Sequence, residues 1–394
     1  MKQPHRPRIK GIRPNLSTIL LLMSALFFVF VARVIYSPLL PTIERDLGFN
    51  HTQAASIFLF ITFGYIGMNI FSGFIASWLG HRTTIFIAML LVSAATLFVA
   101  VSPSVLLIRL GLVVVGIGAG LYPPSGVATV SSLVHSNDEG KVLAIHELGP
   151  NLGYILAPLI AAVFLPRLSW RDCLIFLSVV GMTFAILFFV FSRGGEFRGQ
   201  APVLRNVSRI FSLPSFWITA LLFALGSGAS IGLYSLIPTY LVFERSLDPT
   251  VVNTIVGVSR ISSIIALFFT GYLVDRLGAR LMIGIVLFTA GIATAAFWAE
   301  SRVILLVAVF VQPLLIVTFF PAVLTAAARI TPRRMQNLTL SLLLPIAYGF
   351  GGGILPLLLG WLGDNVSFAL GFLLYGAILT AGSALPLLLK LEHE

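Results

Sequence analysis

The chain has 394 residues, of which 58% are hydrophobic and only 10% are charged, and its net charge is +11. A soluble domain carries about 25% charged residues, so this composition excludes an ordinary water-soluble protein and indicates a polytopic membrane protein. The single cysteine, Cys173, excludes an intrachain disulfide and a cysteine-based metal site. The basic residues gather in loops, where they set orientation in a bilayer, so we expect no nucleic-acid partner.

Apolar segments of about 20 residues predict membrane-spanning helices. The basic N-terminus is followed by an apolar run without a small-residue cleavage site, which predicts a retained first span instead of a signal peptide. In chain order, the twelve predicted spans are 17–40, 54–79, 84–102, 105–133, 142–165, 172–192, 214–243, 250–274, 281–299, 302–328, 337–362 and 366–389.

The 25 Lys and Arg residues are distributed unevenly between the two membrane faces. With the N-terminus inside, 17 lie on the cytoplasmic side, 5 on the other side and 3 within spans. Because cytoplasmic loops carry the excess of Lys and Arg, we expect both termini in the cytoplasm. The expected location is a cell membrane, as a multi-pass protein of a bacterial inner membrane.

Two related halves are indicated by a sequence repeat with an offset of 198 residues. Gly73–Arg82 reads GFIASWLGHR and Gly271–Arg280 reads GYLVDRLGAR, and the same offset relates Tyr36-Ser37 to Tyr234-Ser235 and Pro158 to Pro356. Matches at one offset near half the chain length indicate a duplicated six-helix unit. The longest polar stretch falls between the repeats. The predicted organisation is therefore an N-terminal half at 1–192, a cytoplasmic linker at 193–213 and a C-terminal half at 214–394.

The twelve spans, the basic central loop and the motif G-x(6)-G-x-R after spans two and eight together resemble the major facilitator superfamily. The resemblance implies an all-α membrane fold of two six-helix repeats that alternate access around a central site. It also implies gating loops at Gly73, Gly80 and Arg82, and at Gly271, Asp275, Arg276, Gly278 and Arg280. The first copy departs from the family pattern, because Ser77 and Trp78 replace the Asp-Arg pair.

Arg33 is an arginine inside the first predicted span, and it shares a helix face with Tyr36 and Ser37. A guanidinium at membrane depth is costly and usually faces a cavity or a partner. The segment also resembles the first span of organic-anion and phosphate-ester members of the superfamily, in which an arginine precedes a proline by eight residues, as Arg33 precedes Pro41. The alternative is a side chain that reaches the interface or pairs with an acid.

Arg260 is a second such residue, near the middle of the eighth predicted span. A guanidinium binds carboxylate or phosphate through two parallel hydrogen bonds, so we predict that Arg33 and Arg260 bind an anion, with Tyr36, Asn151 and Tyr234 orienting it. The alternative for Arg260 is a structural ion pair, although the spans offer only Glu147 as an acid. Arg109, near the outer end of span four, is interpreted as a structural residue.

Glu147 and His146 begin the fifth predicted span, and both can exchange protons as their surroundings alternate between wet and dry. They are candidates for proton coupling, and the alternative is a gate or cap close to cytoplasmic water.

The predicted function is secondary active transport of a small, carboxylate-like organic anion by a monomer in a lipid bilayer, with the proton as coupling ion. We expect no cofactor, no metal and no enzymatic activity. Multidrug efflux by antiport, or a transporter-like sensor that does not translocate, are the alternatives.

Overall fold

The computed structural model describes residues 11–198, 207–332 and 335–389. In these residues the chain forms helices and no strands, and twelve helices are long and apolar enough to cross a membrane. The predicted spans are confirmed, most with ends within a few residues. The first differs most, because the helices run from Ile12 to Leu47 and extend past the apolar run into the polar segment Glu44–Asp46.

The first six spans, which we call the N-half, pack as one bundle. In it, α3 contacts α5, and α4 contacts both α5 and α8. Several helix starts are fixed by the local sequence. The Asn50 side chain accepts a hydrogen bond from the Gln53 backbone N–H, and Gln53 bonds back, which forms a capping box. The elements are α1 (Ile12–Val34), α2 (Tyr36–Leu47), α3 (His51–Leu79), α4 (His81–Val101), α5 (Val105–Ser132), η1 (Ser136–Asp138), α6 (Glu139–His146), α7 (Leu148–Phe164) and α8 (Trp170–Phe191).

The last six spans form the C-half, and the short helix α9 (Val207–Phe211) precedes them. Of the predicted linker at 193–213, residues 199–206 lie outside the described residues. The elements are α10 (Pro214–Ser227), η3 (Gly228–Gly232), α11 (Leu233–Phe243), α12 (Pro249–Ser259), α13 (Ile261–Leu277), α14 (Ala279–Ala295), η4 (Ala296–Trp298), α15 (Arg302–Ile316), α16 (Phe319–Ala328), α17 (Gln336–Gly349), η6 (Phe350–Ile354), α18 (Leu355–Asn365), α19 (Phe368–Gly382) and η7 (Leu385–Leu388).

Several spans are interrupted within the membrane. Single turn residues break the first, fifth and eighth spans at Ile35, Glu147 and Arg260. The seventh and eleventh spans contain the π-helical segments η3 and η6, which pack against each other. Such irregular turns inside helices are frequent at functional sites. Glu147 and Arg260 therefore lie at helix breaks, and Arg33 lies two residues before one.

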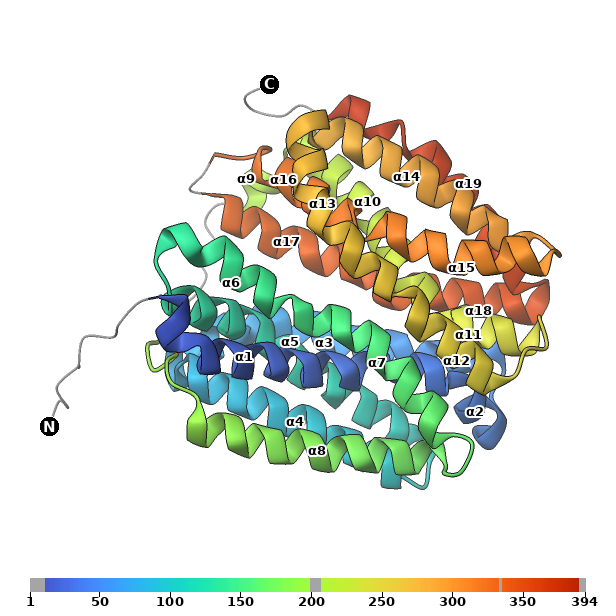
Figure 1. The fold of residues 1–394 in the computed structure, drawn as a ribbon, viewed down its shortest axis with the longest axis horizontal. Coiled ribbons are helices and arrows are strands. Elements are labelled where there is room, and N and C mark those ends of the chain that lie inside the picture. Colours follow the sequence, from blue (N-terminus) through green and yellow to red (C-terminus); the bar gives the residue numbers. More distant parts are fainter. Residues whose placement is uncertain (1–10, 199–206, 333–334, 390–394) are drawn as a thin grey trace, which may run out of the picture.

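The two halves lie side by side, with the N-half drawn from blue to green and the C-half from yellow to red (Figure 1). We call the face where α1 begins the termini face and the opposite face the far face. Between the halves, α2 packs on α11, α3 on α18 and α7 on α12. Since α2, α11, α12 and α18 are the far-face segments of their spans, the halves are closed against each other on the far face.

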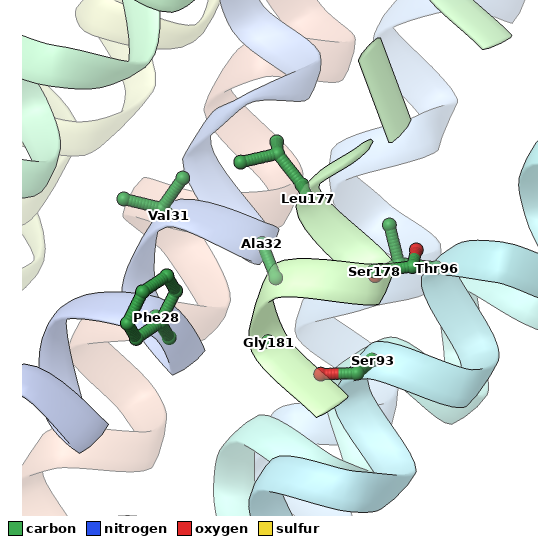
Figure 2. Close-up of a pocket in the computed structure, with 8 residues that line it drawn as sticks. All are labelled: Phe28, Val31, Ala32, Ser93, Thr96, Leu177, Ser178 and Gly181. Atoms are coloured by element: carbon green, nitrogen blue, oxygen red, sulfur yellow. The ribbon is translucent and has the colours of Figure 1, made fainter. Parts of the chain in front are cut away.

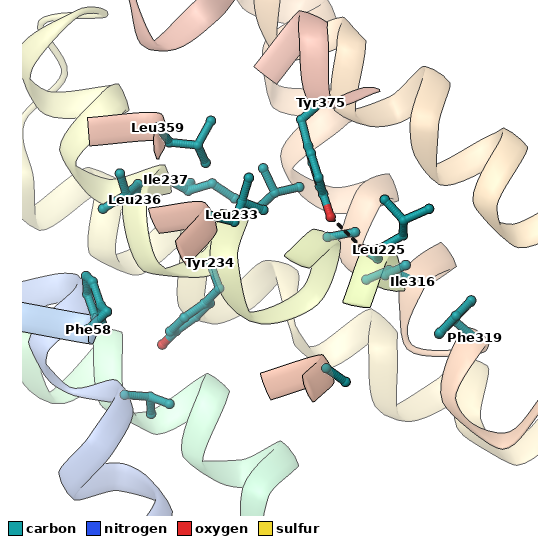
Figure 3. Packing of buried hydrophobic residues seen from close by; sticks show 14 of the residues in the cluster. Phe58, Leu225, Leu233, Tyr234, Leu236, Ile237, Ile316, Phe319, Leu359 and Tyr375 are labelled. Carbon is teal, nitrogen blue, oxygen red and sulfur yellow. Dashed lines mark hydrogen bonds between the residues drawn. The ribbon is translucent and has the colours of Figure 1, made fainter. Parts of the chain in front are cut away.

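The C-half core surrounds the seventh span, the most deeply buried of the twelve (Figure 3). Leu233, Leu236 and Ile237 of α11 pack into it, and the Tyr375 hydroxyl donates a 2.7 Å hydrogen bond to the Leu225 carbonyl. Tyr234 of the same helix points away from this core, toward the ribbons of the N-half. The seventh span therefore presents a tyrosine to the interface between the halves.

Candidate functional site

Arg33 lies in the last turn of α1, beside the break at Ile35. Its guanidinium carbon is 4.1 Å from the centre of the Tyr65 ring and 6.0 Å from that of Phe30. Its Nε atom is buried and has no hydrogen-bond partner. A buried donor without a partner is costly, so at least the Nε–H group of this cation is free to bind a ligand.

Arg260 is the break between α12 and α13, and only 6% of it is exposed. Its guanidinium carbon lies 4.8 Å from the ring centres of both Tyr154 and Tyr234. Tyr154 comes from α7 in the N-half and Tyr234 from α11 in the C-half. The two halves together thus build an aromatic cage around one cation, and such contacts are attractive when desolvated.

Acidic partners for the two arginines are absent among the residues that the structure describes. The ion pairs found there join His51 to Glu44, Arg82 to Glu196, Lys141 to Asp138 and His146 to Glu147. None involves Arg33 or Arg260. In the described part of the chain, neither cation therefore has the structural ion pair considered as the alternative.

Aromatic rings connect the two arginines. Phe30 lies edge-on to Tyr154 with ring centres 4.9 Å apart, and Tyr154 lies edge-on to Tyr234 at 4.7 Å. Phe30 lies beside the Arg33 guanidinium, and Tyr154 lies beside the Arg260 guanidinium. We call Arg33, Arg260, Tyr65, Tyr154 and Tyr234 the central cluster. The structure thus brings together three residues of the predicted binding set, Arg33, Arg260 and Tyr234.

A narrow cavity runs beside the central cluster, with room for roughly one water molecule. Its lining comes from both halves and includes Arg33, Ser37, Thr62, Tyr234, Ser235 and Gly352. A second small cavity lies wholly inside the N-half, between α1, α4 and α8 (Figure 2). There the Thr96 and Ser178 hydroxyls already bond to carbonyls of their own helices, so this cavity offers little to a polar ligand.

Two other predicted binding residues lie apart from the central cluster. Tyr36 is 1% exposed, its buried hydroxyl has no hydrogen-bond partner among the described residues, and it does not line the cavity between the halves. Asn151 donates a 2.9 Å hydrogen bond to the Glu147 carbonyl, one helical turn toward the termini face.

From the sequence, Tyr65 and Tyr154 are cavity candidates, because they are tyrosines within spans whose hydroxyls need partners, but neither belongs to the predicted binding set. The sequence also places Tyr154 on one helix face with Glu147 and Asn151, seven residues beyond Glu147, but it does not indicate that this tyrosine contacts Arg260.

Glu147 and His146 differ in their access to solvent. The Glu147 side chain is 59% exposed, whereas His146 is 1% exposed, and the Nδ1 of His146 lies 3.4 Å from a Glu147 carboxylate oxygen. The other ring nitrogen of His146 lies 3.0 Å from the Tyr122 hydroxyl, which donates to the Leu22 carbonyl. The pair thus links an exposed carboxylate to a buried hydrogen-bonded network in α1 and α5.

The two predicted gating loops differ in their contacts. Gly80 precedes α4 with a positive φ of 79°, and Arg82 forms a 3.4 Å ion pair with Glu196 of the linker. The Arg82 backbone N–H also donates to the Gly195 carbonyl at 2.8 Å. In the second copy, Asp275 and Arg276 are exposed, and Arg276 donates to the Tyr272 hydroxyl one turn away. The first loop is therefore tied to the linker. The other predicted loop residues lie at or near the ends of α3, α13 and α14, namely Gly73, Gly271, Gly278 and Arg280.

Comparisons with known proteins place this arrangement in a family of transporters. The sequence profile of the Major Facilitator Superfamily matches residues 22–259 and 241–394. The chain is 23% identical to a probable sulfoacetate transporter of Cupriavidus necator, over 92% of this chain and 91% of the relative. It is 26% identical to a hexuronate transporter of Bacillus subtilis, over 67% and 65%. It is 24% identical to a quinolone resistance protein of Staphylococcus aureus, over 58% and 60%.

Among solved structures, the chain superimposes on a bacterial homologue of the human lysosomal transporter Spinster in an inward-facing, occupied conformation. The TM-score is 0.84 at 17% sequence identity, over 96% of this chain and 97% of the other. A D-xylose–proton symporter gives a TM-score of 0.78 at 13% identity, over 97% and 99%. These similarities concern the fold, and they agree with the twelve spans and two six-helix halves described above. The chain is a multi-pass membrane transporter, not an enzyme, and it belongs to the major facilitator superfamily.

Proposed function

We propose that the protein transports a small organic anion, which Arg33 and Arg260 bind together at the interface between the two halves. The observation that carries this proposal is the charge of the central cluster. Two permanently charged guanidiniums lie near mid-membrane, one from each half, with aromatic faces but no carboxylate partner among the described residues. An anionic substrate supplies the missing charge.

The chemistry of a guanidinium narrows the substrate class. Its planar fork matches the two oxygens of a carboxylate, sulfonate or phosphate. Tyr65, Tyr154 and Tyr234 supply apolar ring faces for the rest of the substrate. The Ser37 and Ser235 hydroxyls beside the adjoining cavity already bond to the Tyr234 and Ile231 carbonyls. Support also comes from relatives that are named for sulfoacetate and hexuronate, both organic anions.

The cavity is too narrow in this conformation to hold such a substrate, so binding requires the halves to rearrange. Closure of the far face and exposure of Glu147 support a state that receives or releases substrate from the termini face, which the distribution of Lys and Arg assigns to the cytoplasm. We propose Glu147 and His146 as the proton-coupling pair, because an exposed carboxylate here lies 3.4 Å from a buried imidazole. Protons then move in the same direction as the anion, which is symport. The transporting unit is a monomer.

The test is substrate-dependent thermal stabilisation of the purified protein, followed by uptake into proteoliposomes. The probes are sulfoacetate, glucuronate and the lipophilic cation tetraphenylphosphonium. We expect the anions to stabilise the protein, and Arg33→Gln and Arg260→Gln each to weaken the apparent affinity about 10- to 150-fold, the range for a hydrogen bond to a charged group.

The matched control is Arg109→Gln. Arg109 also lies within a span, but its guanidinium contacts the Phe60 ring at 5.6 Å, away from the central cluster. We expect this variant to bind anions as the unmodified protein does. An equal loss in all three variants would contradict the assignment of the site.

Drug efflux is the second candidate, because one relative is a quinolone resistance protein and the cluster is rich in aromatic rings. Stabilisation by tetraphenylphosphonium alone, unchanged in Arg260→Gln, would favour efflux and overturn the anion proposal.

A further inference from the structure

On the far face, the N-terminus of α3 is capped by a carboxylate from the other half of the protein. The backbone N–H groups of His51 and Thr52 each donate a 2.8 Å hydrogen bond to Asp364, one to each carboxylate oxygen. The Thr52 hydroxyl donates a third bond to the same carboxylate. Asp364 lies at the end of α18 in the C-half, whereas α3 belongs to the N-half. These bonds therefore exist only while the two halves are in contact.

The repeat shows that this cap is specific to one half. The 198-residue offset relates the start of α3 to the start of α12, whose own residue Asp248 accepts bonds from the Thr250 and Val251 N–H groups. In α12 the position equivalent to His51 is Pro249, which has no N–H to satisfy. The position equivalent to Asp364 in the first repeat is Pro166, which has no carboxylate. Only α3 thus takes part of its cap from the opposite half.

The surroundings of the cap are close-packed across the same interface. The His51 ring lies between the C-half rings of Phe243 and Phe368, with centres 5.3 and 4.8 Å away. Its Nδ1 lies 2.5 Å from a carboxylate oxygen of Glu44 in its own half. One turn before Asp364, an added Cβ on Gly360 would lie 2.7 Å from the His51 carbonyl oxygen. The two backbones therefore approach as closely as a residue without a side chain permits.

We propose that Asp364 is a positioning residue that holds the far face closed by capping α3 across the interface between the halves. A transporter of this family must separate the halves on that face to complete its cycle. Separation of α18 from α3 breaks three hydrogen bonds to one carboxylate and leaves two helix-terminal N–H groups to water. Asp364 thereby sets how often the far face opens. This role does not depend on the identity of the substrate.

The experiment measures the distance across the far face in the absence of substrate. Spin labels are placed at Leu168 in the α7–α8 loop and at Val303 at the start of α15, both exposed residues on opposite halves. The native cysteine is removed as Cys173→Ala. We expect Asp364→Asn to raise the ratio of far-face-open to far-face-closed protein about 2- to 5-fold, because it removes the negative charge at the N-terminus of α3 and leaves one acceptor oxygen for three donors. Gly360→Ala should shift the ratio in the same direction, because the added methyl group pushes the two backbones apart.

The matched control is Glu244→Gln. Glu244 also caps a helix with its carboxylate, through bonds from the Phe368 and Ala369 N–H groups, but both partners lie within the C-half. It should lower thermal stability without changing the distance distribution. The proposal is overturned if Asp364→Asn lowers thermal stability but leaves the distances unchanged, or if both carboxylate variants shift the distances equally. Because no anion is added, failure here leaves the proposed substrate site untouched.

Discussion

Replacing Arg260 by methionine separates a substrate-binding role from a structural one. Methionine keeps an unbranched, apolar side chain between the rings of Tyr154 and Tyr234 but removes the charge. Contact with two rings contributes about 1–4 kcal/mol to stability, and placing an arginine at the bilayer centre costs at least about 2.5 kcal/mol. Because these terms have opposite sign and similar size, we expect the free energy of unfolding without substrate to change by less than about 2 kcal/mol.

A structural ion pair gives a different result. Removing one partner of a buried pair leaves the other charge uncompensated and costs about 3–5 kcal/mol. The assay is equilibrium unfolding by SDS in mixed micelles, with and without a saturating organic anion. At 100 times its dissociation constant, a bound anion should stabilise the unmodified protein by about 2.7 kcal/mol, and this stabilisation should vanish in Arg260→Met.

The reasoning is refuted if the variant unfolds at least 3 kcal/mol more easily without substrate, because Arg260 then has a structural partner. It is also refuted if anion stabilisation survives the loss of the charge.

Three further predictions concern neighbours of the central cluster. Tyr154→Leu should weaken anion affinity about 2- to 30-fold by removing one ring from the Arg260 cage, whereas Tyr154→Phe should keep it; binding titrations that show equal losses would contradict this. Glu147→Gln should change the free energy of unfolding by less than about 0.5 kcal/mol, because the side chain is exposed. It should abolish uptake driven by a proton gradient while substrate exchange continues. Uptake that still responds to the proton gradient would exclude Glu147 as the coupling group. Gly257→Ala places a Cβ 2.9 Å from the Ile155 carbonyl oxygen of the other half, so it should loosen the contact of α12 with α7 and slow uptake; an unchanged turnover would show that this crossing can relax freely.

The sequence predicted the twelve spans well because length and apolar content are local properties of a chain in a bilayer. It did not predict the breaks at Ile35, Glu147 and Arg260, or the π-helical segments η3 and η6. Residues that weaken a helix mark several of these interruptions, because Gly149-Pro150 follows Glu147, Pro38 lies three residues after Ile35, and η6 contains three consecutive glycines. These residues permit a break, but they do not fix its position, and the break at Arg260 has no proline within its helical turn. Arg33, Glu147 and Arg260 could be recognised from the sequence as rare charged groups within apolar spans. The sequence did not predict that each lies at or beside a helix break.

Contacts between the halves were the least predictable part of the site. Tyr154 shares the Arg260 cage because α7 crosses α12, although more than one hundred residues separate them in sequence. Tyr36 and Tyr234 are equivalent in the repeat, yet only Tyr234 lines the cavity. A π-helical turn holds more residues than an α-helical turn and so rotates the helix that follows it. Segment η3 precedes Tyr234, whereas the equivalent residues 30–34 of the first repeat are α-helical and are followed by the turn residue Ile35. The repeat therefore carries over to the orientation of some side chains, such as Ser37 and Ser235, which both line the cavity, but not to that of Tyr36 and Tyr234.

The repeat nevertheless explains why the two arginines meet at one place. The 198-residue offset pairs Arg33 with Ile231 and Arg260 with Thr62. Ile231 and Thr62 both line the cavity beside Arg33, so all four positions belong to the interface between the halves. The scaffold thus brings these positions to the centre in both repeats, but only one member of each pair carries a charge. The uncharged residues Ile231 and Thr62 occupy the equivalent positions, so packing of the helices does not require an arginine at either one. The cost of burying two cations is therefore best explained by a ligand that both halves must hold at once.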